Sequence, residues 1–324
     1  MHATTPMAVN GNFPDRVVVT EVGPRDGLQA QSEVVGTAAK IRLIEALIQA
    51  GVKDFEATAF VSPKAVPQMA DAAEVLQGVD PALRQRASLG ALVPNAKGAE
   101  RAAAAGVDAM IVFLSASESH NRKNLNCSRA DSLQGFSRVV AIAREAGIPV
   151  HGAIATAFGC PFEGEIPVAD VEEIARAYRA LGIERVTLGD TTGMATPALV
   201  AERCRSLRRT LPDVELALHF HNTRGIGLVN VYAGLAEGVD RYESSIGGLG
   251  GCPFAAGATG NVCTEDLVYL FNECGVASGI DLDALCATSR ELEAVLGYEL
   301  PGQVMKAGPR TRLSPMESVA TAHG

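Results

Sequence analysis

The 324-residue sequence contains no Trp, and aromatic residues make up only 5% of it. Basic residues are also scarce, because 28 Lys and Arg against 37 Asp and Glu give a formal net charge of −9 at pH 7. Nucleic acids and acidic membrane surfaces are polyanions that proteins bind mainly through basic patches. The charge balance therefore argues against both as partners, while a hydrophobic fraction of 47% indicates a globular chain.

The sequence also lacks marks of export or membrane insertion. Residues 1–15 contain neither a basic nor an apolar region, so they predict a flexible tail rather than a signal peptide. Apolar runs stop well short of the ~20 residues that a membrane span needs. The cysteines number seven and contain no C-x-x-C pair. We therefore expect a cytoplasmic protein with reduced thiols and no membrane partner.

Short β-branched segments alternate with longer segments of helical periodicity, which is typical of βα units and a parallel sheet. Strands are expected at 17–22, 52–56, 87–92, 109–113, 149–154, 185–188, 216–220 and 241–245. Helices are expected, among others, at 37–50, 131–146, 168–181, 225–237 and 282–296. Gly51, Gly106, Gly147 and Gly182 each follow a helical segment and predict left-handed helix ends.

About eight such units, without a G-x-G-x-x-G motif after the first strand, favour a (β/α)₈ TIM barrel over an open doubly wound sheet. The predicted organisation is an N-terminal tail over residues 1–15, a barrel over 16–276 and a C-terminal helical extension with a tail over 277–324. Active sites of such barrels lie in the loops that follow the strands. Unusual polar residues should therefore gather there.

Two polar motifs stand at these positions. EVGPRDGLQ follows the first strand at 21–29, and HFHN follows the seventh at 219–222. Residues i and i+2 of a strand face the same side, so His219 and His221 are expected to point into the barrel together, although each alone reads as a core residue. With Asp26 they make half of an octahedral shell, which suits Mg²⁺, Mn²⁺ or another divalent cation.

Further charged residues are expected at the same mouth. Arg25 adjoins Asp26, and a fixed guanidinium near a metal is suited to stabilise an oxyanion or enolate; an ordinary salt bridge is the alternative. Glu56 and Asp190 are expected at the ends of the second and sixth strands, where each either holds Arg25, relays protons or forms a structural pair. Thr264 is expected to cap the last barrel helix.

A glycine-rich segment follows the eighth strand, over residues 244–261. So many glycines predict a mobile lid, although a phosphate cradle is the alternative. Cys252 lies inside this segment, where a thiol is suited to act as a general acid or base or as a nucleophile.

Taken together, the motifs closely resemble the hydroxymethylglutaryl-CoA lyase family over residues 17–276. Further matching motifs are FVSPKAVPQM at 60–69, KNLNCS at 123–128, GCPFEG at 159–164, LGDTTG at 188–193, HFHNTRG at 219–225, GLGGCPFAAGATGN at 248–261 and TEDLVY at 264–269. R-D-G with H-x-H marks a wider superfamily that includes condensing enzymes, whereas the GCPFA loop is typical of the lyases. The family's common form is H-x-H-D-T-Y-G, from which this chain departs at Asn222 and Arg224.

The resemblance implies specific roles. The metal ligands are Asp26, His219, His221 and Asn261; the catalytic residues are Arg25, Cys252, Glu56 and Asp190; the substrate-binding residues are Gln29 and Asn124. Arg224 departs from the family's motif, and as a cation close to the mouth it is expected to bind substrate as well. Arg25 would stabilise the enolate of the departing acetyl-CoA, and Cys252 would take part in proton transfer as its loop closes over the substrate. Asn124 would hold the CoA portion, and Arg224 would bear on the acyl group.

The implied reaction is a retro-Claisen cleavage of 3-hydroxy-3-methylglutaryl-CoA to acetyl-CoA and acetoacetate, a step of leucine degradation, in a homodimer that uses Mg²⁺ or Mn²⁺. A related acyl-CoA such as citramalyl-CoA is the nearest alternative substrate. A condensing acyltransferase acting on a 2-oxo acid is a second alternative, and a binding protein without activity is a third.

Overall fold

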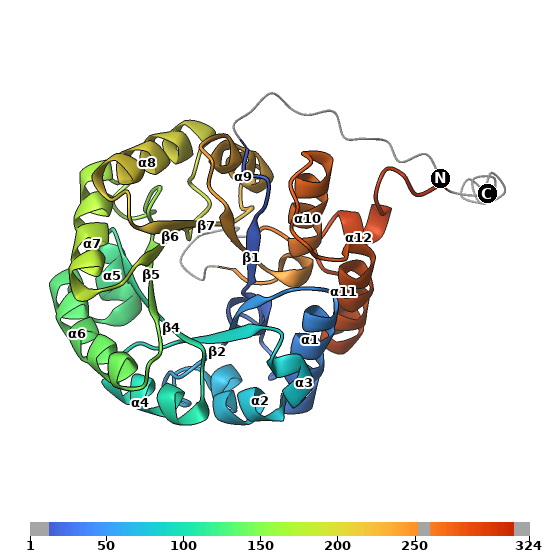
Figure 1. Ribbon diagram of the computed structural model, residues 1–324, viewed down its shortest axis with the longest axis horizontal. Coiled ribbons are helices and arrows are strands. Elements are labelled where there is room, and N and C mark those ends of the chain that lie inside the picture. The colour runs from blue at the N-terminus through green and yellow to red at the C-terminus, as the bar shows by residue number, and fades with distance from the viewer. Residues whose placement is uncertain (1–12, 252–259, 314–324) are drawn as a thin grey trace.

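The computed structural model describes residues 13–251 and 260–313, which form a closed barrel of eight parallel strands (Figure 1). Each strand pairs with the next, and β8 pairs with β1. The predicted TIM barrel is therefore confirmed. The strands are β1 (Val18–Glu21), β2 (Asp54–Ala59), β3 (Ser88–Leu92), β4 (Ala109–Ser115), β5 (Val150–Ala155), β6 (Arg185–Asp190), β7 (Glu215–Phe220) and β8 (Arg241–Ser244).

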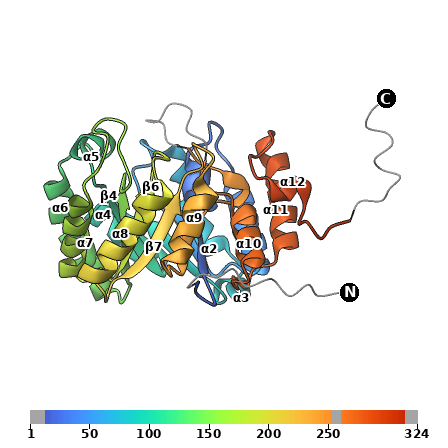
Figure 2. The ribbon, with the colours of Figure 1, turned by 90° about the horizontal axis from the view of Figure 1, so that it is seen from above.

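Helices ring the barrel, and the last two lie outside that ring beside α1 and α10 (Figures 1 and 2). None of the helices in the described part of the chain is long and apolar enough to span a membrane. The helices are α1 (Thr37–Gln49), α2 (Ala72–Gly78), α3 (Pro81–Arg84), α4 (Ala96–Ala105), α5 (Glu118–Leu125), α6 (Arg129–Glu145), α7 (Val168–Leu181), α8 (Pro197–Thr210), α9 (Gly227–Ala236), α10 (Thr264–Glu273), α11 (Leu282–Leu296) and α12 (Val304–Ala307).

Helix α7 illustrates how the pattern of apolar residues builds the ring. Its buried residues recur at helical spacing and include Val171, Ile174 and Tyr178. The ring of Tyr178 lies so close to β5 that a Cβ on Gly152 would come within 2.5 Å of it, so this strand position requires glycine. The Tyr178 hydroxyl donates a hydrogen bond to the carbonyl oxygen of Ala153. Packing and a satisfied polar group thus hold α7 against the barrel.

The helix ends follow the glycine pattern. Gly51, Gly106, Gly147 and Gly182 have φ angles of 103°, 75°, 70° and 90°, the left-handed conformation that glycine adopts without strain. The predicted cap at Thr264 is wrong, because Cys263 is the N-cap and Thr264 is the first residue of α10. The Thr264 hydroxyl is instead bound to Glu21 and Ser244.

Two further expectations are corrected in detail. Glu56 does not end the second strand: β2 continues to Ala59, with a shift in its register to β3 just after Glu56. The segment beyond 296, expected to be a tail, contains the short helix α12.

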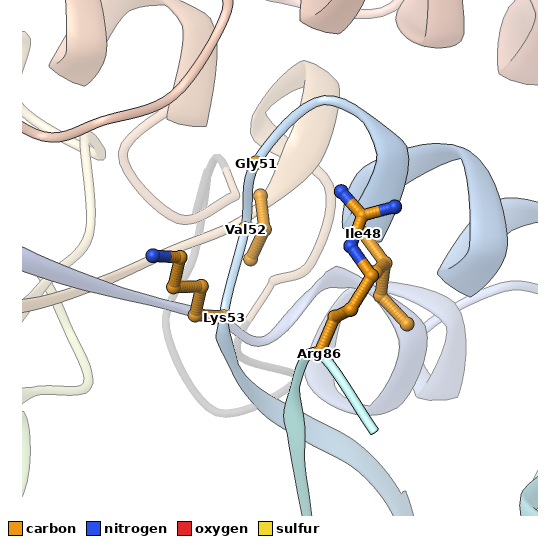
Figure 3. A pocket seen from close by; sticks show the side chains of 5 residues that line it. All are labelled: Ile48, Gly51, Val52, Lys53 and Arg86. Carbon is orange, nitrogen blue, oxygen red and sulfur yellow. The ribbon is translucent and has the colours of Figure 1, made fainter. Parts of the chain in front are cut away.

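The amino-terminal end of the barrel is closed by charged side chains. Arg185 forms ion pairs with Asp54 and Glu215, and Arg241 also pairs with Glu215. A pocket opens at this end beside α1, lined by Ile48, Gly51, Val52, Lys53 and Arg86 (Figure 3). Since its residues precede β2 and β3, it lies away from the loops that carry the polar motifs.

Candidate active site

The loop after β1 is a π-helical turn, η1 (Gly23–Gly27), that carries Arg25 and Asp26. Single π-helical turns are rare and often occur at functional sites. Gly27 packs so tightly on the loop after β8 that a Cβ there would lie 2.7 Å from Ser245 Oγ and 2.8 Å from Leu249 Cβ. The turn thus packs tightly against the loop after β8, and a residue larger than glycine at position 27 would displace the turn.

Asp26, His219 and His221 form a cluster whose potential ligand atoms all lie within 4.8 Å of one another. The two imidazole rings are 5.2 Å apart between centroids. Burial opposes ionisation of Asp26, but the charges of Arg25 and the two histidines outweigh it and lower the pKa of Asp26 to about 2. Asp26 is therefore a carboxylate at neutral pH, as a metal ligand must be.

Asn261 completes this group from the far end of the barrel sequence. Its backbone forms a bridge with His221, and its amide nitrogen donates hydrogen bonds to Asp26 Oδ2 at 2.8 Å and to the Leu249 carbonyl oxygen at 3.0 Å. Both bonds use the nitrogen, so the amide oxygen is turned the other way. Asn261 Oδ1 is buried and accepts no hydrogen bond within the described residues. The Asn261 amide thus lies against Asp26, and an amide oxygen is a ligand type that hard divalent cations accept.

Arg25 is held rigidly beside this cluster. Its Nη1 donates to Asp26 Oδ1 and its Nη2 to Glu56 Oε2, both at 2.7 Å. Burial disfavours the charged guanidinium, but the carboxylates of Glu56 and Asp26 outweigh it and raise the pKa of Arg25 above its ordinary value. Arg25 is therefore a fixed, permanent cation next to the candidate metal site, and Glu56 and Asp26 together fix it.

Asp190 lies at the end of β6 and shapes the loop that follows. Its Oδ1 accepts hydrogen bonds from the backbone N–H groups of Met194 at 2.7 Å and Ala195 at 2.8 Å. Burial raises the pKa of Asp190 to about 7, against the opposing effect of these two bonds. Its Oδ2 is buried and, in the part of the chain described, has no hydrogen-bond partner. This oxygen is thus suited to exchange a proton near neutral pH.

Arg224 joins two mouth loops. Its Nη1 donates to the carbonyl oxygens of Thr192 at 3.0 Å and Gly193 at 2.7 Å, in the loop that Asp190 shapes. The Arg224 residue is exposed at the mouth.

Comparisons with known proteins identify the family of this chain. A family model described as HMGL-like matches residues 16–292. The chain belongs to the HMGL-like family. It is 44% identical to the mitochondrial hydroxymethylglutaryl-CoA lyase of Gallus gallus over 298 residues, which cover 92% of this chain and 99% of that protein. The resemblance inferred from the motifs is therefore confirmed.

Two further members are similarly close. The (R)-citramalyl-CoA lyase of Chloroflexus aurantiacus is 44% identical, with 91% of this chain and 96% of that protein covered. A solved HMG-CoA lyase structure from Acenitobacter baumannii, in complex with coenzyme A and 3-methylmalate, matches with a TM-score of 0.88 and 46% identity. That match covers 93% of this chain and 98% of the other. Both alignments therefore span nearly the full length of this HMGL-like protein and of its relative.

Two expected site residues of this HMGL-like chain are exposed, and a third lies outside the described residues. Gln29 is exposed just after η1, and Asn124 is exposed on α5, at the loops of the first and fourth units. Cys252 lies outside the described residues. Their roles stay predictions.

Glu21, which is buried, and Glu243, which is half-buried, were not assigned a role from the sequence. Glu21 accepts hydrogen bonds from Gly23 N at 2.7 Å, Ile246 N at 2.8 Å and Thr264 Oγ1 at 2.6 Å. It thereby ties the first loop of this HMGL-like barrel to the last. Burial raises the pKa of Glu21 to about 8. The second is Glu243, whose Oε2 lies 2.9 Å from His219 Nδ1.

Proposed function

We propose that this protein is a divalent-metal-dependent lyase that cleaves 3-hydroxy-3-methylglutaryl-CoA to acetyl-CoA and acetoacetate. The observation that carries the proposal is the cluster of Asp26, His219 and His221 with the cationic Arg25 fixed beside it. Relatives that bear this lyase name are 41–45% identical over most of the chain. A related solved structure contains coenzyme A, which supports an acyl-CoA as the substrate class.

Asp26, His219, His221 and Asn261 are the residues that would hold the cation, which we propose to be Mg²⁺ or Mn²⁺. Such a cation supplies Lewis acidity, which lowers the pKa of the substrate's tertiary hydroxyl. The protein's own ligands would occupy about four positions of an octahedral shell and leave the others for substrate oxygens.

In the proposed reaction, the hydroxyl proton is removed and its oxygen becomes the ketone of acetoacetate. The bond between C2 and C3 breaks, and its electron pair passes to the acetyl thioester as an enolate. Arg25, held by Glu56 at 2.7 Å, would stabilise the negative charge as it forms, without any need to reorient. This is the main contribution that we assign to the guanidinium.

Two proton transfers must accompany bond cleavage. We assign removal of the hydroxyl proton to Asp190, because its pKa is about 7 and its Oδ2 has no hydrogen-bond partner among the described residues, which suits a group that takes and returns a proton. Protonation of the enolate carbon to give acetyl-CoA we assign to Cys252. We assign Gln29, Asn124 and Arg224 to substrate binding, with Asn124 on the CoA portion.

The test is a product analysis. The protein is stripped with a chelator, reloaded with Mg²⁺ or Mn²⁺ and incubated with 3-hydroxy-3-methylglutaryl-CoA, and acetyl-CoA and acetoacetate are measured separately. We expect equal amounts of both products. Asp26→Asn, which keeps the shape of the side chain but removes its charge, is the matched inactive control. Release of no acetyl-CoA by the metal-saturated protein would overturn the proposal.

Citramalyl-CoA is the second candidate substrate, favoured by the 44% identical (R)-citramalyl-CoA lyase. Its cleavage also releases acetyl-CoA but yields pyruvate in place of acetoacetate. The ratio of kcat/KM for the two thioesters therefore decides between them. Consumption of acetyl-CoA with a 2-oxo acid, without cleavage of either thioester, would instead favour a condensing enzyme.

We further propose a cytoplasmic homodimer. The six described cysteines are all free, which supports a reducing compartment. The dimer rests on the family resemblance, and light scattering on the purified protein tests it: a mass close to twice 33.7 kDa is expected.

A further inference from the structure

Glu243 lies on β8 and, unlike Glu56, contacts a histidine and a hydroxyl group rather than an arginine. The register of β7 and β8 places it directly opposite His219. Its Oε2 lies 2.9 Å from His219 Nδ1, and its Oε1 accepts a 2.7 Å hydrogen bond from Thr187 Oγ1 on β6. Both carboxylate oxygens are thus engaged, and three adjacent strands fix one carboxylate.

This contact determines which nitrogen of His219 faces the candidate metal site. A neutral imidazole carries a proton on one ring nitrogen and a lone pair on the other. The carboxylate accepts the proton of Nδ1–H, so the lone pair lies on Nε2. We propose that Glu243 is a positioning residue that holds His219 in this tautomer and presents Nε2 to the cation. The inference rests on the metal centre of the proposed function.

The charges around the site agree with this role. Asp26, Glu56 and Glu243 carry three formal negative charges, and Arg25 carries one positive charge. Among these four side chains the excess is two negative charges, which equals the charge of a divalent cation.

Glu215, which lies on the same strand as His219, provides a comparison with Glu243. It lies four residues before His219 on β7, where it pairs with Arg185 and Arg241 at the opposite end of the barrel. Its partners are both arginines, so it acts as a structural ion pair. Glu243 instead binds a metal-ligand candidate and a hydroxyl group. Glu243 is therefore placed to act at the candidate metal site, whereas Glu215 holds the opposite end of the barrel together.

The experiment measures the Kd of the metal-free protein for Mn²⁺ by EPR, which detects the unbound ion. Glu243→Gln is expected to weaken binding by about 10- to 100-fold. Thr187→Val leaves the carboxylate in place and is expected to weaken binding less. Glu215→Gln is the matched control and is expected to leave the Kd unchanged. A folded Glu243→Gln variant with the wild-type Kd would overturn the role.

A second measurement uses only the wild-type protein and covers the case in which Glu243→Gln does not fold. ¹⁵N NMR of labelled histidine in the Mg²⁺-loaded protein is expected to show His219 protonated at Nδ1 and not at Nε2; the opposite tautomer would refute the proposal. Wild-type protein that binds Mn²⁺ but cleaves no thioester contradicts the proposed function alone. Wild-type protein that binds no Mn²⁺ overturns the metal centre and this role together.

Discussion

Replacement of Arg25 by Met tests the central electrostatic argument. The side chain of Arg25 is 14% exposed and donates two 2.7 Å hydrogen bonds to carboxylates, so it is already oriented before any substrate arrives. Removal of a single preorganised donor to a developing oxyanion typically costs about 10²- to 10³-fold in kcat. Arg25 adds a full charge, so we expect a loss near the upper end, about 10³-fold or ~4 kcal/mol of transition-state stabilisation.

The same substitution affects stability through a different residue. Glu56 is only 5% exposed and would lose its cationic partner. Breaking a buried pair from one side typically costs about 3 to 5 kcal/mol, because the remaining charge is unpaired. Adding Glu56→Gln removes that charge, so the double variant should regain most of the free energy of unfolding. It should not regain activity.

Two measurements are therefore made on the wild type, on Arg25→Met and on the double variant Arg25→Met, Glu56→Gln. Single-turnover acetyl-CoA release at saturating Mn²⁺ gives the chemical step, and urea unfolding gives stability. Loss of activity in both variants, with stability restored only in the double variant, is the expected pattern. A kcat for Arg25→Met near that of the wild type, or recovered activity in the double variant, would refute the role assigned to Arg25.

Three further outcomes are expected. Chelation should abolish thioester cleavage and Mg²⁺ or Mn²⁺ should restore it, whereas Asn261→Ala should raise the metal concentration needed for half-maximal activity. Glu21 binds its proton more tightly in the folded state, with a pKa of about 8 against 4.5, so stability should fall as pH rises through that interval. Glu21→Gln keeps an acceptor for Gly23 N and Ile246 N, and its urea-unfolding curves should lose this pH dependence. Cys252→Ala should lower kcat while leaving the Mn²⁺ Kd unchanged; release of the metal would contradict its assignment to proton transfer.

The barrel was predictable because its signals are local. Alternating strand and helix patterns, and glycines such as Gly182 at helix ends, depend on residues only a few positions apart. The cluster of Asp26, His219 and His221 was predictable for a related reason. Asp26 and His221 follow strands and His219 lies near the end of one, and in a barrel all strand ends meet at one mouth.

Other features needed information that no local pattern contains. Glu243 looks like any strand residue until the register places it opposite His219. Glu21 ends a buried strand, and only the closed barrel shows that its partners come from residues 246 and 264. The cap predicted at Thr264 failed for the same reason, since a hydroxyl suited to capping was bound instead by a carboxylate distant in sequence.

The side-chain amide of Asn261 donates a hydrogen bond to Asp26, which lies 235 positions earlier in the chain. Asp26 is among the first residues of the barrel to leave the ribosome during synthesis, and Asn261 is among the last. The proposed metal shell therefore cannot be complete on a nascent chain until the eighth unit has emerged and closed against the first. Capture of the cation would thus report the end of folding, and a chain stalled before residue 261 should bind the ion weakly.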